Sequence, residues 1–175
     1  METRAKSRKR NNGPDFSAFF TPMGLLKWAA VILMLVFLAT RFGGKKESSA
    51  AFPAVAEAVK AAADLTPMQE GDNQMIKRLY GLDPGSFEGV MLYYPTTNMG
   101  AEEILVVKLS DLSQQETVKA AMEARIQAQM DVFEGYAPEQ YATLEKGVVE
   151  VHGNYLLLVV AEDTAPVQKA FLDAL

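Results

Sequence analysis

The sequence predicts an α+β protein: one N-terminal transmembrane helix, followed by a compact domain with a four-stranded antiparallel sheet covered by helices. An unbroken apolar run from Trp28 to Ala39 lies within the hydrophobic segment 23–42. Beyond this segment, apolar residues recur at helical spacing in some stretches and form short strand-like runs in others. The order strand, strand, helix occurs twice, at 87–134 and 148–175, which predicts a β-β-α-β-β-α core.

The segment 23–42 is expected to be an uncleaved signal anchor. Twenty residues at about 1.5 Å rise per residue span about 30 Å, the thickness of the bilayer's hydrocarbon core. A cleaved signal peptide is the alternative, because the purely apolar core has a length typical of one. The nearest cleavage-like site, Ala54-Val55-Ala56, lies well past the apolar run. The position of that site favours the anchor.

The basic residues that flank the anchor predict its orientation. On the N-terminal side they are Arg4, Lys6, Arg8, Lys9, Arg10 and Lys27, and on the other side Arg41, Lys45 and Lys46. The excess of Lys and Arg on the N-terminal side places the N-terminus in the cytoplasm and the C-terminal domain outside. We therefore expect a disordered basic leader (1–22), the anchor (23–42), a flexible tether (43–51) and an extracytoplasmic domain (52–175).

Charge divides the chain in the same way. Residues 47–175 contain eight Lys or Arg against twenty Asp or Glu, a net charge of −12, whereas the whole chain carries −5. A domain this acidic is repelled by nucleic acid, so we expect no nucleic-acid partner. The expected partners are the lipid bilayer, through the anchor, and a protein of the envelope. The chain has no cysteine, which excludes disulfides, thiol catalysis and cysteine-ligated metals.

The first half of the domain is expected to contain two helices and two strands. Pro53 suits the first turn of a helix that runs to about Asp64. A second helix follows the cap Asp72 and ends at Gly81, which suits the left-handed position after a helix. The turn at 83–86 precedes two strands. These strands are expected at 87–94 and 103–109, joined by the loop 95–102.

The second half begins with the longest predicted helix, 113–134. Ser113 and Glu116 match a capping box, Asp111 adds negative charge near the helix start, and Gly135 ends the helix. Its inward stripe is expected to be Val118, Met122, Ile126, Met130 and Phe133. The same stripe would suit a dimeric coiled coil, but core packing is the favoured interpretation; the oligomeric state stays open.

The remaining elements are a helix at 138–146, strands at 148–152 and 155–161, and a last helix after Asp163 or Thr164. Gly153-Asn154 is a dipeptide typical of a tight hairpin turn. The strand at 155–161 is continuously apolar, so we expect it to be central and well covered. The four strands are expected to form one sheet with helices packed on one face.

Several runs of this sequence resemble an uncharacterised family of small bacterial envelope proteins, catalogued only as a domain of unknown function. The runs are Glu102–Lys108, Ala124-Arg125, Tyr136-Ala137-Pro138 and Gly153–Val160. The resemblance covers about residues 52–175. It implies an anchored extracytoplasmic domain, and it brings no activity, ligand or catalytic residue.

The sequence contains no motif typical of a catalytic, cofactor or metal site. His152 is the single histidine, so a multi-histidine metal site cannot form within one chain, and a solvent-facing or turn role is favoured over catalysis. The paired acids Glu102-Glu103 and Glu162-Asp163 suit Ca²⁺ binding or glycan cleavage, but solubility and helix capping are the favoured roles. Glycine spacing matches no nucleotide-binding motif.

Two further groups of residues suit a binding surface. The tyrosines Tyr93, Tyr94, Tyr136, Tyr141 and Tyr155 are candidates for the lining of a groove. The loop 95–100 contains the apolar residue Met99. We predict no catalytic, cofactor-binding or metal-ligating residue and no cofactor. The expected function is a non-catalytic binding or accessory component of the bacterial envelope. The alternatives are an envelope hydrolase or metal-dependent enzyme that uses the acids, and a small-ligand carrier.

Overall fold

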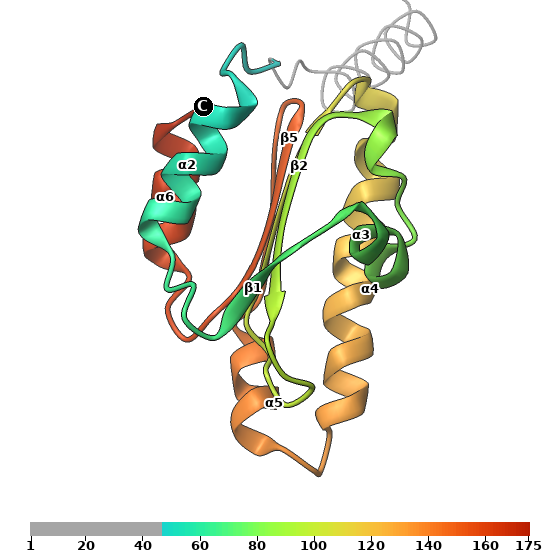
Figure 1. Ribbon diagram of the computed structural model, residues 1–175, viewed down its shortest axis with the longest axis vertical. Coiled ribbons are helices and arrows are strands. Elements are labelled where there is room, and N and C mark those ends of the chain that lie inside the picture. Colours follow the sequence, from blue (N-terminus) through green and yellow to red (C-terminus); the bar gives the residue numbers. More distant parts are fainter. Residues whose placement is uncertain (1–46) are drawn as a thin grey trace, which may run out of the picture. The chain divides into compact units, whose positions relative to one another are not determined.

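The computed structural model describes residues 47–175 (Figure 1). The predicted leader (1–22) and anchor (23–42) lie outside the described residues. No helix within residues 47–175 is both long and apolar enough to cross a membrane. The elements are α2 (Phe52–Ala62), β1 (Met68–Gly71), α3 (Asn73–Tyr80), the 3₁₀ helix η2 (Pro84–Ser86), β2 (Phe87–Pro95), β3 (Glu103–Leu109), the 3₁₀ helix η3 (Leu112–Gln114), α4 (Gln115–Phe133), α5 (Pro138–Glu145), β4 (Val148–His152), β5 (Tyr155–Val160) and α6 (Ala165–Asp173).

The antiparallel sheet has five strands in the order β1-β2-β3-β5-β4. The prediction of four strands was wrong, because it missed β1. This strand pairs with the end of β2, with Met68 opposite Pro95 and Gly71 opposite Leu92. Its sequence, MQEG, has one buried residue and two exposed polar ones. A run this short and polar has no strand pattern of its own, so the pairing with β2 determines its conformation.

Helices cover both faces of the sheet, which corrects the prediction of helices on one face. Helices α3 and α4 lie on one side, and α2 and α6 on the other (Figure 1). The cause is the composition of the central strands β3 and β5. The sheet separates two hydrophobic cores: one packs against α3 and α4 (the α4 core), and the other against α2 and α6 (the α6 core). In both strands successive buried residues alternate between these cores, with Leu158 in the α4 core and Leu157 in the α6 core. A strand that is apolar on both faces needs a helical layer on each.

The predicted ends of α3 are confirmed. The side chain of Asp72 accepts a hydrogen bond of 2.8 Å from the backbone N–H of Met75. Gly81 follows the helix with a φ of 67°, the left-handed conformation that residues with a Cβ rarely adopt. These two caps limit α3 to about two turns and place Arg78 and Tyr80 in its last turn.

The capping box before α4 differs from the predicted one. Asp111 accepts a hydrogen bond of 2.7 Å from the N–H of Ser113, and Gln114 accepts one of 3.2 Å from the N–H of Asp111. The predicted pair, Ser113 and Glu116, does not form the box, because a 3₁₀ turn at Leu112–Gln114 moves the helical start toward the N-terminus. Gln114 also donates to the carbonyl oxygen of Ser86 at 3.0 Å, which connects the start of α4 to β2.

Part of the segment expected to be a tether, residues 47–51, is described by the structure. The N–H of Ser48 donates to Oδ1 of Asn154 at 2.9 Å, and its hydroxyl donates to the carbonyl oxygen of Leu175 at 2.9 Å. The hydroxyl of Tyr155 donates to the carbonyl oxygen of Ala50 at 2.8 Å. The chain therefore enters the domain along the β4–β5 turn and the C-terminus.

Candidate functional site

A glutamate is buried in the α4 core at the start of β3. Glu103 is 1 % exposed, in a strand whose other buried residues are aliphatic. Strand alternation places its side chain on the same face as Leu105 and Val107, toward α3 and α4. A buried carboxylate needs hydrogen-bond donors and a compensating charge, because burial removes its hydration.

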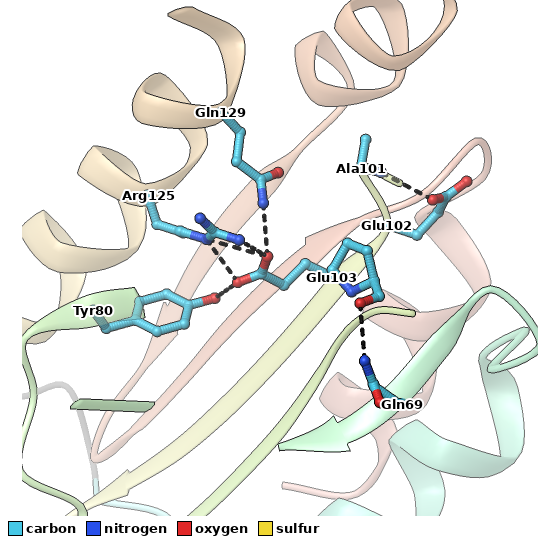
Figure 2. Close-up of polar contacts among 8 residues, drawn as sticks. Gln69, Tyr80, Ala101, Glu102, Glu103, Arg125 and Gln129 are labelled. Atoms are coloured by element: carbon cyan, nitrogen blue, oxygen red, sulfur yellow. Dashed lines mark hydrogen bonds and ion pairs between the residues drawn. The ribbon is translucent and has the colours of Figure 1, made fainter. Parts of the chain in front are cut away.

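Three side chains supply these donors, and they converge on Glu103 from two helices (Figure 2). From α4, Arg125 donates through Nε at 3.1 Å to Oε1 and through Nη2 at 2.7 Å to Oε2. Gln129, one turn further along α4, donates through Nε2 to Oε2 at 3.0 Å. From α3, the hydroxyl of Tyr80 donates to Oε1. The carboxylate therefore accepts hydrogen bonds at both oxygens and has a cation as its partner.

The cluster changes the ionisation of two of its members. Burial raises the pKa of Tyr80 well above its ordinary value of 10.0, and the negative charge of Glu103 raises it further. Burial opposes the charged form of Arg125, but the hydrogen bonds and charge of Glu103 outweigh it and raise the pKa of the guanidinium. The tyrosine therefore stays a hydrogen-bond donor and the arginine a cation across the neutral pH range.

A groove of about 520 Å³ lies above this cluster, between α3, α4 and the loop after β2. Arg125 and Gln129 form part of its floor, so residues that hold Glu103 also face the groove. Arg78 lines it from α3, and no Asp or Glu lines it among the described residues. Its apolar lining includes Met75, Leu79, Tyr94, Ala128, Val132 and Phe133.

Comparison with known proteins identifies the family. A family model described as "Domain of unknown function (DUF4358)" matches residues 61–161. The chain belongs to the DUF4358 family. The resemblance that the sequence suggested, to a family of unknown function, is therefore confirmed. No curated protein and no solved structure matches the chain.

The DUF4358 match contains the whole cluster and the groove. It begins at the end of α2 and stops just after β5, so it includes all five strands with α3, α4 and α5. Helix α6 and most of α2, which cover the opposite face, lie outside it. The family-defining part of the fold is therefore the sheet with its α3–α4 side.

The acids singled out in the sequence are divided between the two faces of the DUF4358 sheet. Glu102 lies apart from the Glu103 cluster (Figure 2), as alternation along the strand requires. It lines a second hollow, of about 350 Å³, together with Glu162, Asp163 and Asp64. Within residues 47–175, no group of three or more His, Asp or Glu is arranged to hold a metal ion. Asp163 accepts a hydrogen bond of 3.1 Å from the N–H of Ala165, at the start of α6.

The other candidates are also spread over the DUF4358 fold. His152 is exposed at the end of β4, and its Nε2 lies 3.1 Å from Oε2 of Glu150. Tyr93 belongs to the α6 core and Tyr94 packs on the α4 side, where it lines the groove. Tyr136 is 68 % exposed, and its hydroxyl contacts Sδ of Met99 at 3.5 Å. Of the candidate tyrosines, only Tyr94 lines the groove.

Sequence reasoning missed Arg78, Arg125 and Gln129. A signal for the last two was present, because Arg125 and Gln129 are four residues apart on the inward side of α4, among Met122 and Phe133. Polar residues on an otherwise apolar stripe indicate a buried polar partner. The identity of that partner, Glu103, depends on β3 lying under α4. No pattern in the sequence marks Arg78.

Proposed function

We propose that this DUF4358 protein is a single-pass, membrane-anchored component of the bacterial envelope whose extracytoplasmic domain works by binding rather than catalysis. The observation that supports the binding role is the groove between α3 and α4. Ligand sites are concave, of about 300–1,000 Å³, largely apolar, and contain a few convergent polar groups. The groove has this size, and its lining combines apolar side chains with a comparable share of polar ones, including Gln69, Thr96, Arg125 and Gln129. The anchored, extracytoplasmic location rests on the segment 23–42 and its flanking charges.

Glu103 suits a positioning role better than a catalytic one. A general acid or base must reach the substrate within hydrogen-bond distance. Glu103 is 1 % exposed and accepts hydrogen bonds from Tyr80, Arg125 and Gln129. Its carboxylate instead holds the arginine and the glutamine at the floor of the groove. This arrangement favours a preformed binding site.

The hydrolase alternative depends on the second hollow, since Glu103 is enclosed. Glycan cleavage uses two carboxyl groups on either side of the scissile bond. In this hollow Glu102 accepts a hydrogen bond of 3.1 Å from the N–H of Ala101, and Asp163 caps α6. Both carboxylates thus have structural roles. The small-ligand carrier is a special case of the binding proposal, with the groove as its site.

Photo-crosslinking in intact cells tests the binding role. A benzoylphenylalanine at position 132, where the native valine is 67 % exposed at the groove, should form a specific adduct. The same probe at position 172, where the native leucine is 43 % exposed on α6, serves as the control. Ala128→Trp should abolish the adduct, because Ala128 lines the groove. Ala120→Trp, at an exposed alanine of the same helix outside the groove, should preserve it.

Two results would contradict the proposal. One is the same set of adducts from positions 132 and 172, since that indicates non-specific capture. The other is a cellular phenotype of the gene deletion that is rescued by Ala128→Trp but not by the triple variant Glu102→Gln, Glu162→Gln and Asp163→Asn. That pattern would indicate that the function depends on the acids of the second hollow and on acid–base chemistry.

A further inference from the structure

The groove between α3 and α4 carries positive charge in a domain that is otherwise strongly acidic. Two arginines, Arg78 and Arg125, line it, and the described lining contains no acidic side chain. Residues 47–175 together carry a net charge of −12. The charge of the groove is therefore opposite in sign to the net charge of the domain. Such a groove favours anions among the molecules that reach it.

Arg125 has one nitrogen left for a ligand. Its Nε and Nη2 donate to Glu103, whereas Nη1 takes no part in these bonds. The side chain is 18 % exposed and lines the groove. Because the two bonds to Glu103 hold the planar guanidinium in place, the direction of the remaining N–H groups is fixed before a ligand arrives.

Arg78 is the second donor, and it has no acidic partner within residues 47–175. It is exposed on α3, and no described carboxylate forms an ion pair with it. Its neighbour Lys77 differs, because Nζ of Lys77 lies 3.0 Å from Asp83, away from the groove. Arg78 thus supplies one full positive charge at the rim, and Arg125 supplies directed donors at the floor.

The charge balance limits the ligand to a single negative charge. Arg125 is already neutralised by Glu103, so Arg78 is the one lining cation without a partner in the described structure. A dianion such as a phosphate monoester would bring its second charge close to the Glu103–Arg125 pair without compensation. The apolar walls, including Met75, Leu79 and Phe133, match a hydrocarbon body.

From these features we propose that the groove binds a small organic acid: one carboxylate, held by Arg78 and by Nη1 of Arg125, on an aliphatic or aromatic body. This proposal rests on the proposed function, since it names the ligand class of the same groove. A carboxylate accepts hydrogen bonds from two separate donors, and its hydrocarbon part fills the space between the helices.

The test uses the full chain in lipid nanodiscs with methionine methyl groups labelled with ¹³C. The methyl group of Met75 reports on the groove, and the buried Met122 is the internal control. Hexanoate should shift the Met75 signal in a saturable manner. Hexanamide, which has the same body without the charge, should bind at least about tenfold more weakly. Arg78→Gln should weaken the binding of hexanoate to the same degree, whereas Lys77→Gln should leave the affinity for hexanoate unchanged.

The outcomes separate this inference from the proposed function. Equal binding of hexanoate and hexanamide, both blocked by Ala128→Trp, overturns the carboxylate proposal and preserves the groove as a binding site. Tighter binding of hexyl phosphate than of hexanoate overturns the single-charge argument. If a tetrapeptide with a free C-terminal carboxylate binds and hexanoate does not, the ligand is a polypeptide and the small-acid proposal is overturned. If Met75 responds to none of these probes and position 132 gives no adduct, both proposals fail.

Discussion

Glu103 and Arg125 form an ion pair between a buried carboxylate and a partly exposed guanidinium, with Nη2 2.7 Å from Oε2. The pair connects β3 to α4 and lies between the hydrophobic core and the groove. Replacing one partner of such a pair costs more than replacing both, because the remaining partner stays buried with an unmet need for hydrogen bonds or charge. This asymmetry makes the pair testable.

Arg125→Met should lower the free energy of unfolding by about 3–5 kcal/mol, because Glu103 then remains buried without its cation. The double variant Glu103→Leu, Arg125→Met should recover much of this loss. Urea unfolding followed by circular dichroism measures both. Lys119→Met is the control on the same helix, since its partner Glu123 is exposed. If the loss of stability in the double variant equals the sum of the losses in the two single variants, the energetic coupling between Glu103 and Arg125 is contradicted.

Tyr80→Phe should cost about 1.5–3 kcal/mol at neutral pH, the typical contribution of a hydrogen bond to a charged group. The folded pKa of Tyr80 lies well above the unfolded value of 10.0, so its contribution is fully present below pH 10.0. The contribution is then lost as the pH rises toward the folded pKa. The stability difference between wild type and Tyr80→Phe should therefore shrink above pH 10.0. Tyr136→Phe, at an exposed tyrosine, should show no such trend.

Leu157→Ala and Leu158→Ala should each cost about 2–5 kcal/mol, since each removes a fully buried side chain. The two leucines are neighbours on β5 and belong to different cores. Comparable thermal destabilisation of both variants is the signature of a sheet covered on two faces. Leu172→Ala, at an exposed position of α6, should cost much less. A nearly neutral effect at either Leu157 or Leu158 would mean that one face is open.

Gly89→Ala should destabilise the domain by about 1–3 kcal/mol through overpacking. A Cβ at position 89 would lie 2.3 Å from Cγ of Phe52, so the Phe52 ring or α2 must move. In a thermal unfolding series, Phe52→Ala should remove most of the additional cost. Gly85→Ala is the matched control, because its Cβ would come no closer than 3.8 Å to a neighbour. Equal costs at positions 85 and 89 would show that α2 does not pack here.

The predicted topology has a direct chemical test, because the chain contains no cysteine. Ser113→Cys, at an exposed position before α4, should react with a membrane-impermeant maleimide on intact cells. Ser7→Cys, in the predicted cytoplasmic leader, should react only after the cells are permeabilised. Labelling of Ser7→Cys alone on intact cells would reverse the orientation.

Most of the domain's secondary structure could be predicted from local signals. The caps of α3 at Asp72 and Gly81, the tight turn at Gly153-Asn154 and the continuously apolar β5 are all confirmed. Each depends on interactions between residues close in sequence, or on the composition of one segment. β1 was missed because its conformation depends on pairing with β2, more than twenty residues away in the chain.

The candidate site was much less predictable. Glu103 was noted only as one of a pair of acids, and its burial against Arg125 and Gln129 involves residues more than twenty positions apart. The groove joins Arg78 of α3 to Arg125 of α4, and no sequence period connects two such positions.

The sequence by itself determined most of the helices and strands, the polarity of charge along the chain and membership of the DUF4358 family, because these follow from local spacing and composition. Only the tertiary structure decided that helices cover both faces of the sheet, that Glu103 is buried against Arg125, and that two arginines line one groove. The physical reason is that burial and charge pairing depend on which elements pack together, and packing brings together residues that are distant in the chain.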